Sequence, residues 1–213
     1  GCVLDEIEGQ PAVSLVAFDF QGTRVKGVRW PGYVNFPEIN LRYYVREAAG
    51  WRRRGVSFVR ELVPKRLIAW SARWLYNEPY VACPMRSFIQ TTTLGQGPLL
   101  EPGLSMHHEF RLARKAHTIR ATAAAATFRP APDSSEHWFK EHQWGFGRTR
   151  TGEALVYEVR HPHWDVHAVR TVDLDVDFGS VYGPQWAFLK DTPPIHFAWA
   201  VGSEIAVYPH GRM

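Results

Sequence analysis

Short runs of β-branched and aromatic residues, separated by glycine and proline, recur along almost the whole chain. Such runs have the length and composition of β-strands, and glycine and proline commonly end them. Most connections between the runs are too short to contain a crossover helix, which leaves antiparallel pairing as the default. We expect about ten strands, at residues 13–20, 38–46, 55–61, 80–92, 104–112, 118–128, 144–148, 154–160, 167–178 and 196–208.

Two segments carry helical signals instead. After Pro64, apolar and small residues recur at helical spacing over residues 65–76, and proline is tolerated in the first turn of a helix. Asp133 precedes Glu136 by three positions, close to a capping box, which predicts a short helix through Trp138 and Phe139. The expected fold is therefore mainly β, or α+β by a strict count, with an antiparallel sheet and two short helices.

The length and composition of the chain favour one domain over residues 1–213. All-β domains of about 200 residues are common, and 45% apolar residues are enough for one core. No run approaches the roughly 18 unbroken apolar residues that a membrane-spanning helix needs. No leader-like segment opens the chain, so we expect a cytoplasmic protein without a membrane partner.

Cysteine content and net charge narrow the function classes. Cys2 and Cys83 stand in neither a zinc-binding spacing nor a disulfide framework. The net charge of +4 is a weak positive excess, which would suit anionic ligands or nucleic acid. A nucleic-acid role ranks last among the alternatives, and no nucleic-acid partner is expected.

Three pairs of histidines raise the question of a metal site: His107 with His108, His161 with His163, and His137 with His142. Neighbouring residues of a strand point to opposite faces, so the first pair does not readily share one ion. The second pair would place both rings on one side of an extended segment, yet no third ligand stands at a useful spacing. We therefore expect no metal site.

Two further motifs fall short of known binding patterns. Asp173, Asp175 and Asp177 alternate as in a calcium loop, but Phe178 stands where that loop needs glycine. The segment Gly145-Phe-Gly147 is too short to indicate a dinucleotide-binding motif. We expect no cofactor.

The segment Phe-Pro-Glu-Ile-Asn-Leu-Arg at residues 36–42 is better suited to a binding site. Glu38, Asn40 and Arg42 alternate with apolar residues, so one strand face would present an acid, an amide and a guanidinium. If that face looks into a barrel, these groups converge on a polar ligand. An exposed polar face and a structural ion pair are the alternatives.

Several blocks of the chain resemble the YqjF-like uncharacterised family, which is grouped with the acetoacetate decarboxylase-like superfamily. The blocks span residues 36–46, 55–61, 72–80, 135–139, 161–164 and 193–197, followed by the segment to Pro209. The resemblance implies a barrel-like or cone-like antiparallel sheet around a central cavity. It departs at the beginning, where the family carries another strand and helix, so we expect the chain to lack these.

The resemblance also bears on catalysis. Decarboxylases of the superfamily form a Schiff base between a lysine and a β-keto acid, with a pattern close to G-R-E-x-x-G-x-P-K-K. The segment from Arg73 to Pro79 occupies that block, but Tyr80 stands at the expected lysine position, and a phenol cannot form an imine. Lys65 precedes Arg73, against the family order. Schiff-base decarboxylation is therefore disfavoured, and enzymatic activity stays open.

What remains is a cavity lined by Glu38, Arg42, Arg73 and Tyr80. Arg73 would bind a carboxylate through its guanidinium fork. Tyr80 would donate a hydrogen bond to a carbonyl or enolate oxygen, and Glu38 would accept a proton. In the structural alternative, Arg73 anchors the helix and Tyr80 belongs to the core.

The expected function is that of a small-molecule-binding or non-decarboxylating enzyme domain for a small carboxylate or keto compound. A residual lyase with a relocated lysine is one alternative. A non-enzymatic oligomeric interaction module is another, and homo-oligomers are compatible with ligand binding.

Overall fold

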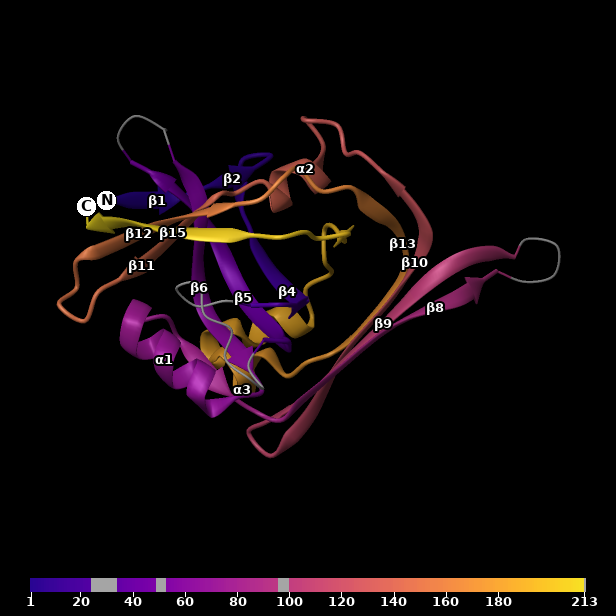
Figure 1. Cartoon of the computed structure of the whole chain (residues 1–213), viewed down its shortest axis with the longest axis horizontal. Coiled ribbons are helices and arrows are strands. Elements are labelled where there is room, and N and C mark those ends of the chain that lie inside the picture. The colour runs from indigo at the N-terminus through magenta and orange to yellow at the C-terminus, as the bar shows by residue number, and fades with distance from the viewer. Residues whose placement is uncertain (24–33, 49–52, 96–99, 213) are drawn as a thin grey trace. The chain divides into compact units, whose positions relative to one another are not determined.

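The computed structural model describes residues 1–23, 34–48, 53–95 and 100–212 (Figure 1). The chain forms two compact units, each assembled from segments that alternate along the sequence. The first unit comprises Gly1–Pro84, His142–His161 and Ile205–Met213, and the second comprises Met85–Glu141 and Pro162–Glu204. One domain over residues 1–213, without the family's first strand and helix, stays a prediction.

An eight-stranded sheet forms the first unit. Its main path runs β1-β5-β6-β11-β12-β15, with β4 paired to β5 and β7 paired to β6. The pairs are antiparallel except for β6 with β7 and β6 with β11. The strands are β1 (Cys2–Leu4), β4 (Val13–Phe20), β5 (Phe36–Glu47), β6 (Arg54–Val63), β7 (Tyr80–Ala82), β11 (Trp144–Arg148), β12 (Ala154–Arg160) and β15 (Ala206–Arg212). The short strands β2 (Glu6–Ile7) and β3 (Gln10–Pro11) form a separate hairpin.

The core of this unit lies along β5 and β6, because both strands are flanked by others. Ile39, Leu41 and Leu62 are almost fully buried there. Helix α1 (Arg66–Tyr76) follows β6 and packs Ala69 against Phe36 and Val63. The expected helix over 65–76 is thus confirmed, with Lys65 as its N-cap residue.

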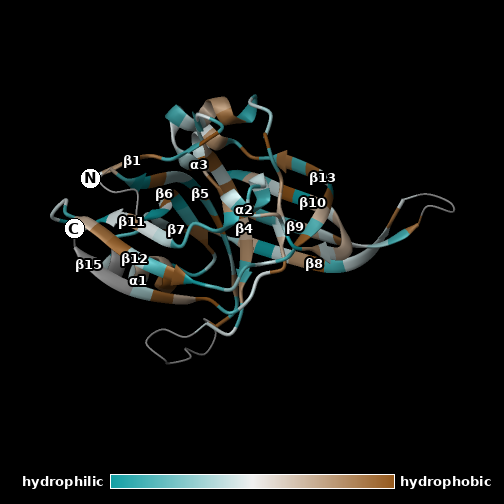
Figure 2. Cartoon of the chain, turned by 90° about the horizontal axis from the view of Figure 1, so that it is seen from above, coloured by the Kyte–Doolittle hydropathy of each residue, from teal (hydrophilic) through white to brown (hydrophobic). Residues whose placement is uncertain are grey.

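The second unit contains a five-stranded antiparallel sheet in the order β14-β13-β10-β9-β8. Its strands are β8 (Met85–Leu94), β9 (Glu101–Leu112), β10 (Lys115–Phe128), β13 (Val166–Asp175) and β14 (Trp199–Ala200). Figure 1 shows that β9, β10 and β13 are long and curved. Both hydrophobic and hydrophilic residues occur along β10 and β13 (Figure 2).

Helix α2 (Ser135–Lys140) confirms the second expected helix, with a correction to its cap. Ser134, rather than Asp133, is the N-cap residue, and its Oγ accepts a hydrogen bond from the backbone N–H of His137 at 3.2 Å. Ser134 thereby satisfies one of the backbone N–H groups of the first turn that have no partner within the helix.

The C-terminal third differs from the expected strands. The strand expected to reach Phe178 ends at Asp175, because the carboxylate of Asp177 accepts from the N–H of Ser180 at 3.0 Å and caps helix α3 (Phe178–Tyr182). A 3₁₀ helix, η2 (Pro184–Lys190), follows. The single strand expected over 196–208 is divided into β14 and β15, and Gly202 between them has a positive φ of 78°.

The fold class is confirmed as mainly β, with 55% of residues in strands and 14% in helices, and with a curled antiparallel sheet. Within the described part of the chain, no helix combines the length and the apolar character needed to span a membrane.

Candidate functional site

Three glutamates and two tyrosines meet in the interior of the first unit. Glu38 comes from β5, Glu61 from β6, Tyr80 from β7 and Tyr157 from β12, while Glu78 directly follows α1. Tyr80 is the cross-strand partner of Glu61, which places both side chains on one face of the sheet. The side chains of all three glutamates are buried. We call these five residues the acid cluster.

Glu38 is the best connected carboxyl group of the acid cluster. The hydroxyl of Tyr80 donates to its Oε2 at 3.0 Å, and the amide of Asn40 donates to its Oε1 at 3.1 Å. In contrast, Glu61 Oε2 and Glu78 Oε1 are buried without a hydrogen-bond partner among the described residues. A buried carboxylate oxygen without a donor is costly, so these two groups favour the protonated form.

The pKa values of the three carboxyl groups are raised. Burial raises the pKa of Glu38 to about 7, and the charge of Glu78 adds to this while hydrogen bonds from Asn40 and Tyr80 oppose it. Burial also raises the pKa of Glu78 to about 7. Burial and the charges of Glu38 and Glu78 raise the pKa of Glu61 well above its usual range. Near neutral pH the acid cluster therefore holds exchangeable protons.

The two tyrosines act as proton donors in hydrogen bonds. Burial, followed by the charges of Glu38 and Glu61, raises the pKa of Tyr80 well above its usual range. Burial and the charge of Glu78 do the same to the pKa of Tyr157. Both hydroxyl groups thus keep their protons at neutral pH, and each can stabilise a negatively charged oxygen.

Two glycines of β11 make room for the acid cluster. A Cβ on Gly145 would lie 2.0 Å from Cζ of Tyr157, its cross-strand partner, which is far inside contact distance. A Cβ on Gly147 would lie 3.3 Å from Oε1 of Glu78. The glycine pair that is too short for a nucleotide motif therefore has a steric role beside Tyr157 and Glu78.

A pocket of about 360 Å³ lies between α1, β7 and the turn that follows β11. Arg66, Arg73 and Arg150 contribute three guanidinium groups to its lining, and within the described residues none of them forms an ion pair. Trp70 and Trp74, one helical turn apart, stack with ring centroids 6.2 Å apart and also line the pocket. We call this the arginine pocket.

The four residues proposed from the sequence divide between these two places. Glu38 belongs to the acid cluster and Arg73 to the arginine pocket, whereas Tyr80 belongs to both. Arg42 is partly buried on β5, and its charge acts on Glu38 while its guanidinium lies 5.7 Å from the centre of the Tyr44 ring. Of the face expected to carry Glu38, Asn40 and Arg42, the first two share a hydrogen bond, whereas the pairing of β5 with β6 is irregular between Leu41 and Arg42.

Sequence reasoning missed Glu61, Glu78 and Tyr157. Glu61 carried a usable signal, because a glutamate followed by Leu62 and Val63 near the end of an apolar strand is an unusual place for a charge. Glu78 and Tyr157 carried none, since their positions depend on the C-terminal end of α1 and on the pairing of β12 with β11.

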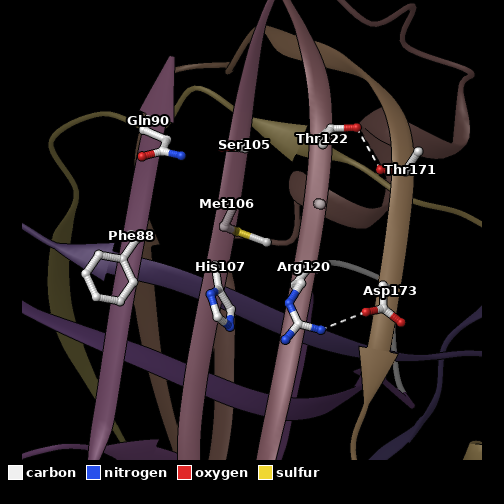
Figure 3. A pocket seen from close by; sticks show the side chains of 10 residues that line it. Phe88, Gln90, Ser105, Met106, His107, Arg120, Thr122, Thr171 and Asp173 are labelled. Carbon is white, nitrogen blue, oxygen red and sulfur yellow. Dashed lines mark hydrogen bonds and ion pairs between the residues drawn. The ribbon is translucent and has the colours of Figure 1, made fainter. Parts of the chain in front are cut away.

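The second unit has its own pocket, of about 480 Å³, on one face of its sheet (Figure 3). Its polar side chains are largely paired with one another. Arg120 Nη1 donates to Asp173 Oδ2 at 2.9 Å, and the hydroxyl groups of Thr122 and Thr171 lie 2.7 Å apart. We place the candidate site in the first unit, where Tyr80 lines the arginine pocket and also donates a hydrogen bond to Glu38, a carboxyl group of raised pKa.

Residues 1–202 match the family DUF2071, described as "Uncharacterized conserved protein (COG2071)". The chain belongs to this family. The family resemblance found in the sequence is confirmed. No curated protein matches this DUF2071 member.

Two solved structures resemble this DUF2071 chain. One is the enduracididine biosynthesis enzyme MppR, complexed with the condensation product of pyruvate and imidazole 4-carboxaldehyde. Its sequence is 11% identical to this chain, and the superposition has a TM-score of 0.44. The matched region covers 86% of this chain and 67% of the MppR chain. The other is acetoacetate decarboxylase from Legionella pneumophila subsp. pneumophila str. Philadelphia 1, which is 8% identical, covers 77% of this chain and 71% of its own, and has a TM-score of 0.37.

Proposed function

We propose that the first unit binds a small carboxylate or keto compound in the arginine pocket and exchanges a proton with it through Tyr80 and Glu38. One observation carries this proposal. Tyr80 lines the pocket and also donates a hydrogen bond to Glu38, so it connects a place for an anion with a store of protons.

The binding half of the proposal rests on charge and shape. A guanidinium matches a carboxylate with two parallel N–H bonds, and Arg73 has neighbours of the same charge in Arg66 and Arg150. The exposed rings of Trp70 and Trp74 supply apolar surface for a short carbon chain. These features favour a small anion with an apolar end.

The chemical half rests on the raised pKa values. A carboxyl group whose pKa is about 7 serves well as a general base and acid at neutral pH. In the reaction we propose, a carboxylate takes a proton from the carbon next to a ketone. The electron pair of that C–H bond forms a carbon–carbon double bond, and the π pair of the carbonyl group moves to its oxygen. Tyr80 stabilises the resulting enolate with its hydroxyl group, and return of the proton restores the ketone.

Binding can be followed through the tryptophans of the arginine pocket. We expect 2-oxobutyrate to change the tryptophan fluorescence saturably and R73L to weaken binding at least about tenfold, since a bidentate charged pair is lost. R86L, at an exposed arginine of the second unit, is the matched control and should bind as the parent protein does. A parent protein without a saturable response, or equal losses in both variants, contradicts the binding site.

Proton transfer is separable from binding. In heavy water, we expect ¹H NMR to show loss of the C3 protons of 2-oxobutyrate faster with protein than with buffer. E38Q should slow this exchange by about 10²–10⁴-fold while retaining the fluorescence response. If the C3 protons exchange no faster with the parent protein than with buffer, the proposed proton transfer is contradicted and only the binding function remains.

The lyase alternative needs a lysine shielded from solvent, and the structure offers one candidate among the described residues. Among the described lysines, Lys140 has a side chain that is only 7% exposed, with Nζ 2.5 Å from Oε1 of Glu141. An ion-paired ammonium is a poor nucleophile, which argues against a Schiff base. Borohydride treatment with acetoacetate should leave every lysine unlabelled in the mass spectrum, whereas a reduced adduct on Lys140 would favour the lyase.

Association into homo-oligomers stays a proposal, as does the interaction-module alternative. Light scattering over a range of protein concentrations measures the association into homo-oligomers. A concentration-independent monomer would count against both.

A further inference from the structure

Three metal-ligating side chains meet in the second unit. His137 lies on α2, Glu141 is the C-cap residue of that helix, and His163 lies in the segment that precedes β13. One ligand atom from each can be chosen so that all three lie within 4.8 Å of one another. Nδ1 of His163 is 3.0 Å from Oε2 of Glu141, and the His137 and His163 rings stack with centroids 5.5 Å apart.

The local structure explains this meeting. His137 and Glu141 are four positions apart at the end of α2, which places both side chains on one side of the helix. The turn that carries His163 is held by Arg129, whose guanidinium donates to the carbonyl oxygen of His163 and pairs with Asp165 at 2.8 Å. These contacts all join residues of the second unit.

We propose that His137, Glu141 and His163 form a binding site for a divalent transition metal, with zinc as the best match. Two imidazole nitrogens and one carboxylate oxygen are a donor set that zinc uses with a fourth position left open. Ligand atoms around a tetrahedral zinc lie roughly 3.3 Å apart, given bonds of about 2.0–2.1 Å. The separation of 3.0 Å between Nδ1 of His163 and Oε2 of Glu141 is close to this value, and the other two separations are at most 4.8 Å. The stacked His137 and His163 rings therefore have to turn for their nitrogens to converge on one ion.

Burial and charge fit an open site rather than a sealed one. Oε1 of Glu141 pairs with Lys140, and Oε2 lies beside Nδ1 of His163, so we assign Oε2 as the ligand oxygen. The Glu141 side chain is 9% exposed, whereas that of His163 is 63% exposed, so an ion reaches the site from solvent past His163. The ammonium of Lys140 opposes a nearby cation, which makes the site weaker than a four-ligand structural zinc site.

This metal site is independent of the function proposed for the first unit. The proposal differs from the expectation of no metal site, which considered three pairs along the sequence: His107 with His108, His161 with His163, and His137 with His142. The structure brings one member of each pair together and adds Glu141 as the third ligand. A variant of His161 distinguishes the pair His161 with His163 from the proposed set, because His161 is not one of the three ligands.

Calorimetric titration of tag-free, chelator-treated protein with zinc chloride tests the proposal. We expect one equivalent of zinc to bind and E141Q and H137A each to weaken binding at least about tenfold, a loss that even outer ligand partners can cause. H161A is the matched control, since it removes a histidine two residues from His163, and it should bind zinc as the parent protein does.

A second readout separates coordination from nonspecific binding. Cobalt in place of zinc should give visible absorption bands of a site with nitrogen ligands, and E141Q should weaken or abolish them. Circular dichroism establishes that each variant is folded, and the near-isosteric E141Q decides the outcome if H137A unfolds. Absence of zinc binding in the parent protein, or equal binding in E141Q and H161A, would overturn the proposal in favour of an ion pair between Glu141 and His163.

Discussion

The hydroxyl of Tyr80 donates a hydrogen bond to Oε2 of Glu38 at 3.0 Å. The assignment of Tyr80 to the lysine position of the decarboxylase pattern stays a prediction from the sequence. A phenol cannot form an imine, so in the function that we propose Tyr80 serves in proton transfer rather than in covalent catalysis. The acid cluster around Tyr80 supplies carboxyl groups for that role.

Y80F tests the contact between Tyr80 and Glu38 directly. The hydrogen bond from Tyr80 lowers the pKa of Glu38, so its loss should raise that pKa further above about 7. Carboxyl ¹³C NMR measures the titration. Y43F, on the same strand as Glu38, is the control. A Glu38 titration unchanged or moved to lower pH in Y80F would contradict the assignment.

E78Q should remove a pH-dependent loss of stability. The folded pKa of Glu78 is raised from 4.5 to about 7, so the folded chain binds more protons than the unfolded chain between these values. Stability is therefore lost as the pH rises from about 4.5 through 7, by up to about 3 kcal/mol for such a shift. E78Q should be more stable than the parent protein at pH 8 but not at pH 4.5.

Urea unfolding at both pH values measures the effect of E78Q. E153Q, at an exposed glutamate of the turn before β12, is the matched control and should change the free energy of unfolding equally little at both. A variant that loses stability at pH 8 would show that the ionised carboxylate of Glu78 is favourable in the folded chain.

G145A should destabilise the fold more than G147A. The new Cβ at residue 145 meets the ring of Tyr157 at 2.0 Å, and neither strand can move without breaking its pairing. We expect a loss of at least about 3 kcal/mol, the upper end of the usual cost of overpacking. At residue 147 the nearest atom is the flexible carboxyl end of Glu78, so the cost should be smaller. Thermal or urea unfolding compares the two variants, and equal losses would contradict this steric account.

The sequence contained most of the strands and both expected helices, because hydrophobic period and turn residues are local signals. Caps are also local, yet the roles of Ser134 and Asp177 were missed since several polar residues compete near each helix start. Glu38 and Tyr80 could be proposed together only through the family resemblance. These residues lie on β5 and β7, which both pair with β6. The distance between the two strands along the sequence does not predict that they share this partner.

The remaining site residues needed tertiary structure for a different reason. Glu78 lies in the acid cluster because Asn77 ends α1 in a left-handed conformation, with a φ of 53°. Glu141 approaches His163 through the return of the chain from β12, which no residue spacing encodes. Sequence patterns predict which face of an element is polar, whereas the meeting of three distant polar side chains is set by how the elements pair.

His142 should contribute a pH dependence of the opposite sign to that of Glu78. Burial lowers the pKa of His142 from 6.5 to about 4, although its hydrogen bond with Asp5 opposes this. The unfolded chain therefore binds a proton between these values that the folded chain does not, and stability is lost as the pH falls from about 6.5 to 4. The loss is of the order of 3 kcal/mol for a shift of this size.

H142Q removes this titration and should make the free energy of unfolding less dependent on pH between 6.5 and 4. Its stability should be lower at pH 7, because the His142 ring packs 4.7 Å from that of Tyr44 and its Nε2 lies 3.3 Å from Oδ2 of Asp5. The change in slope, rather than the absolute stability, is therefore the decisive quantity. Urea unfolding at several pH values measures it, with H161Q as the control. An unchanged slope in H142Q would show that His142 takes up its proton equally well in the folded chain.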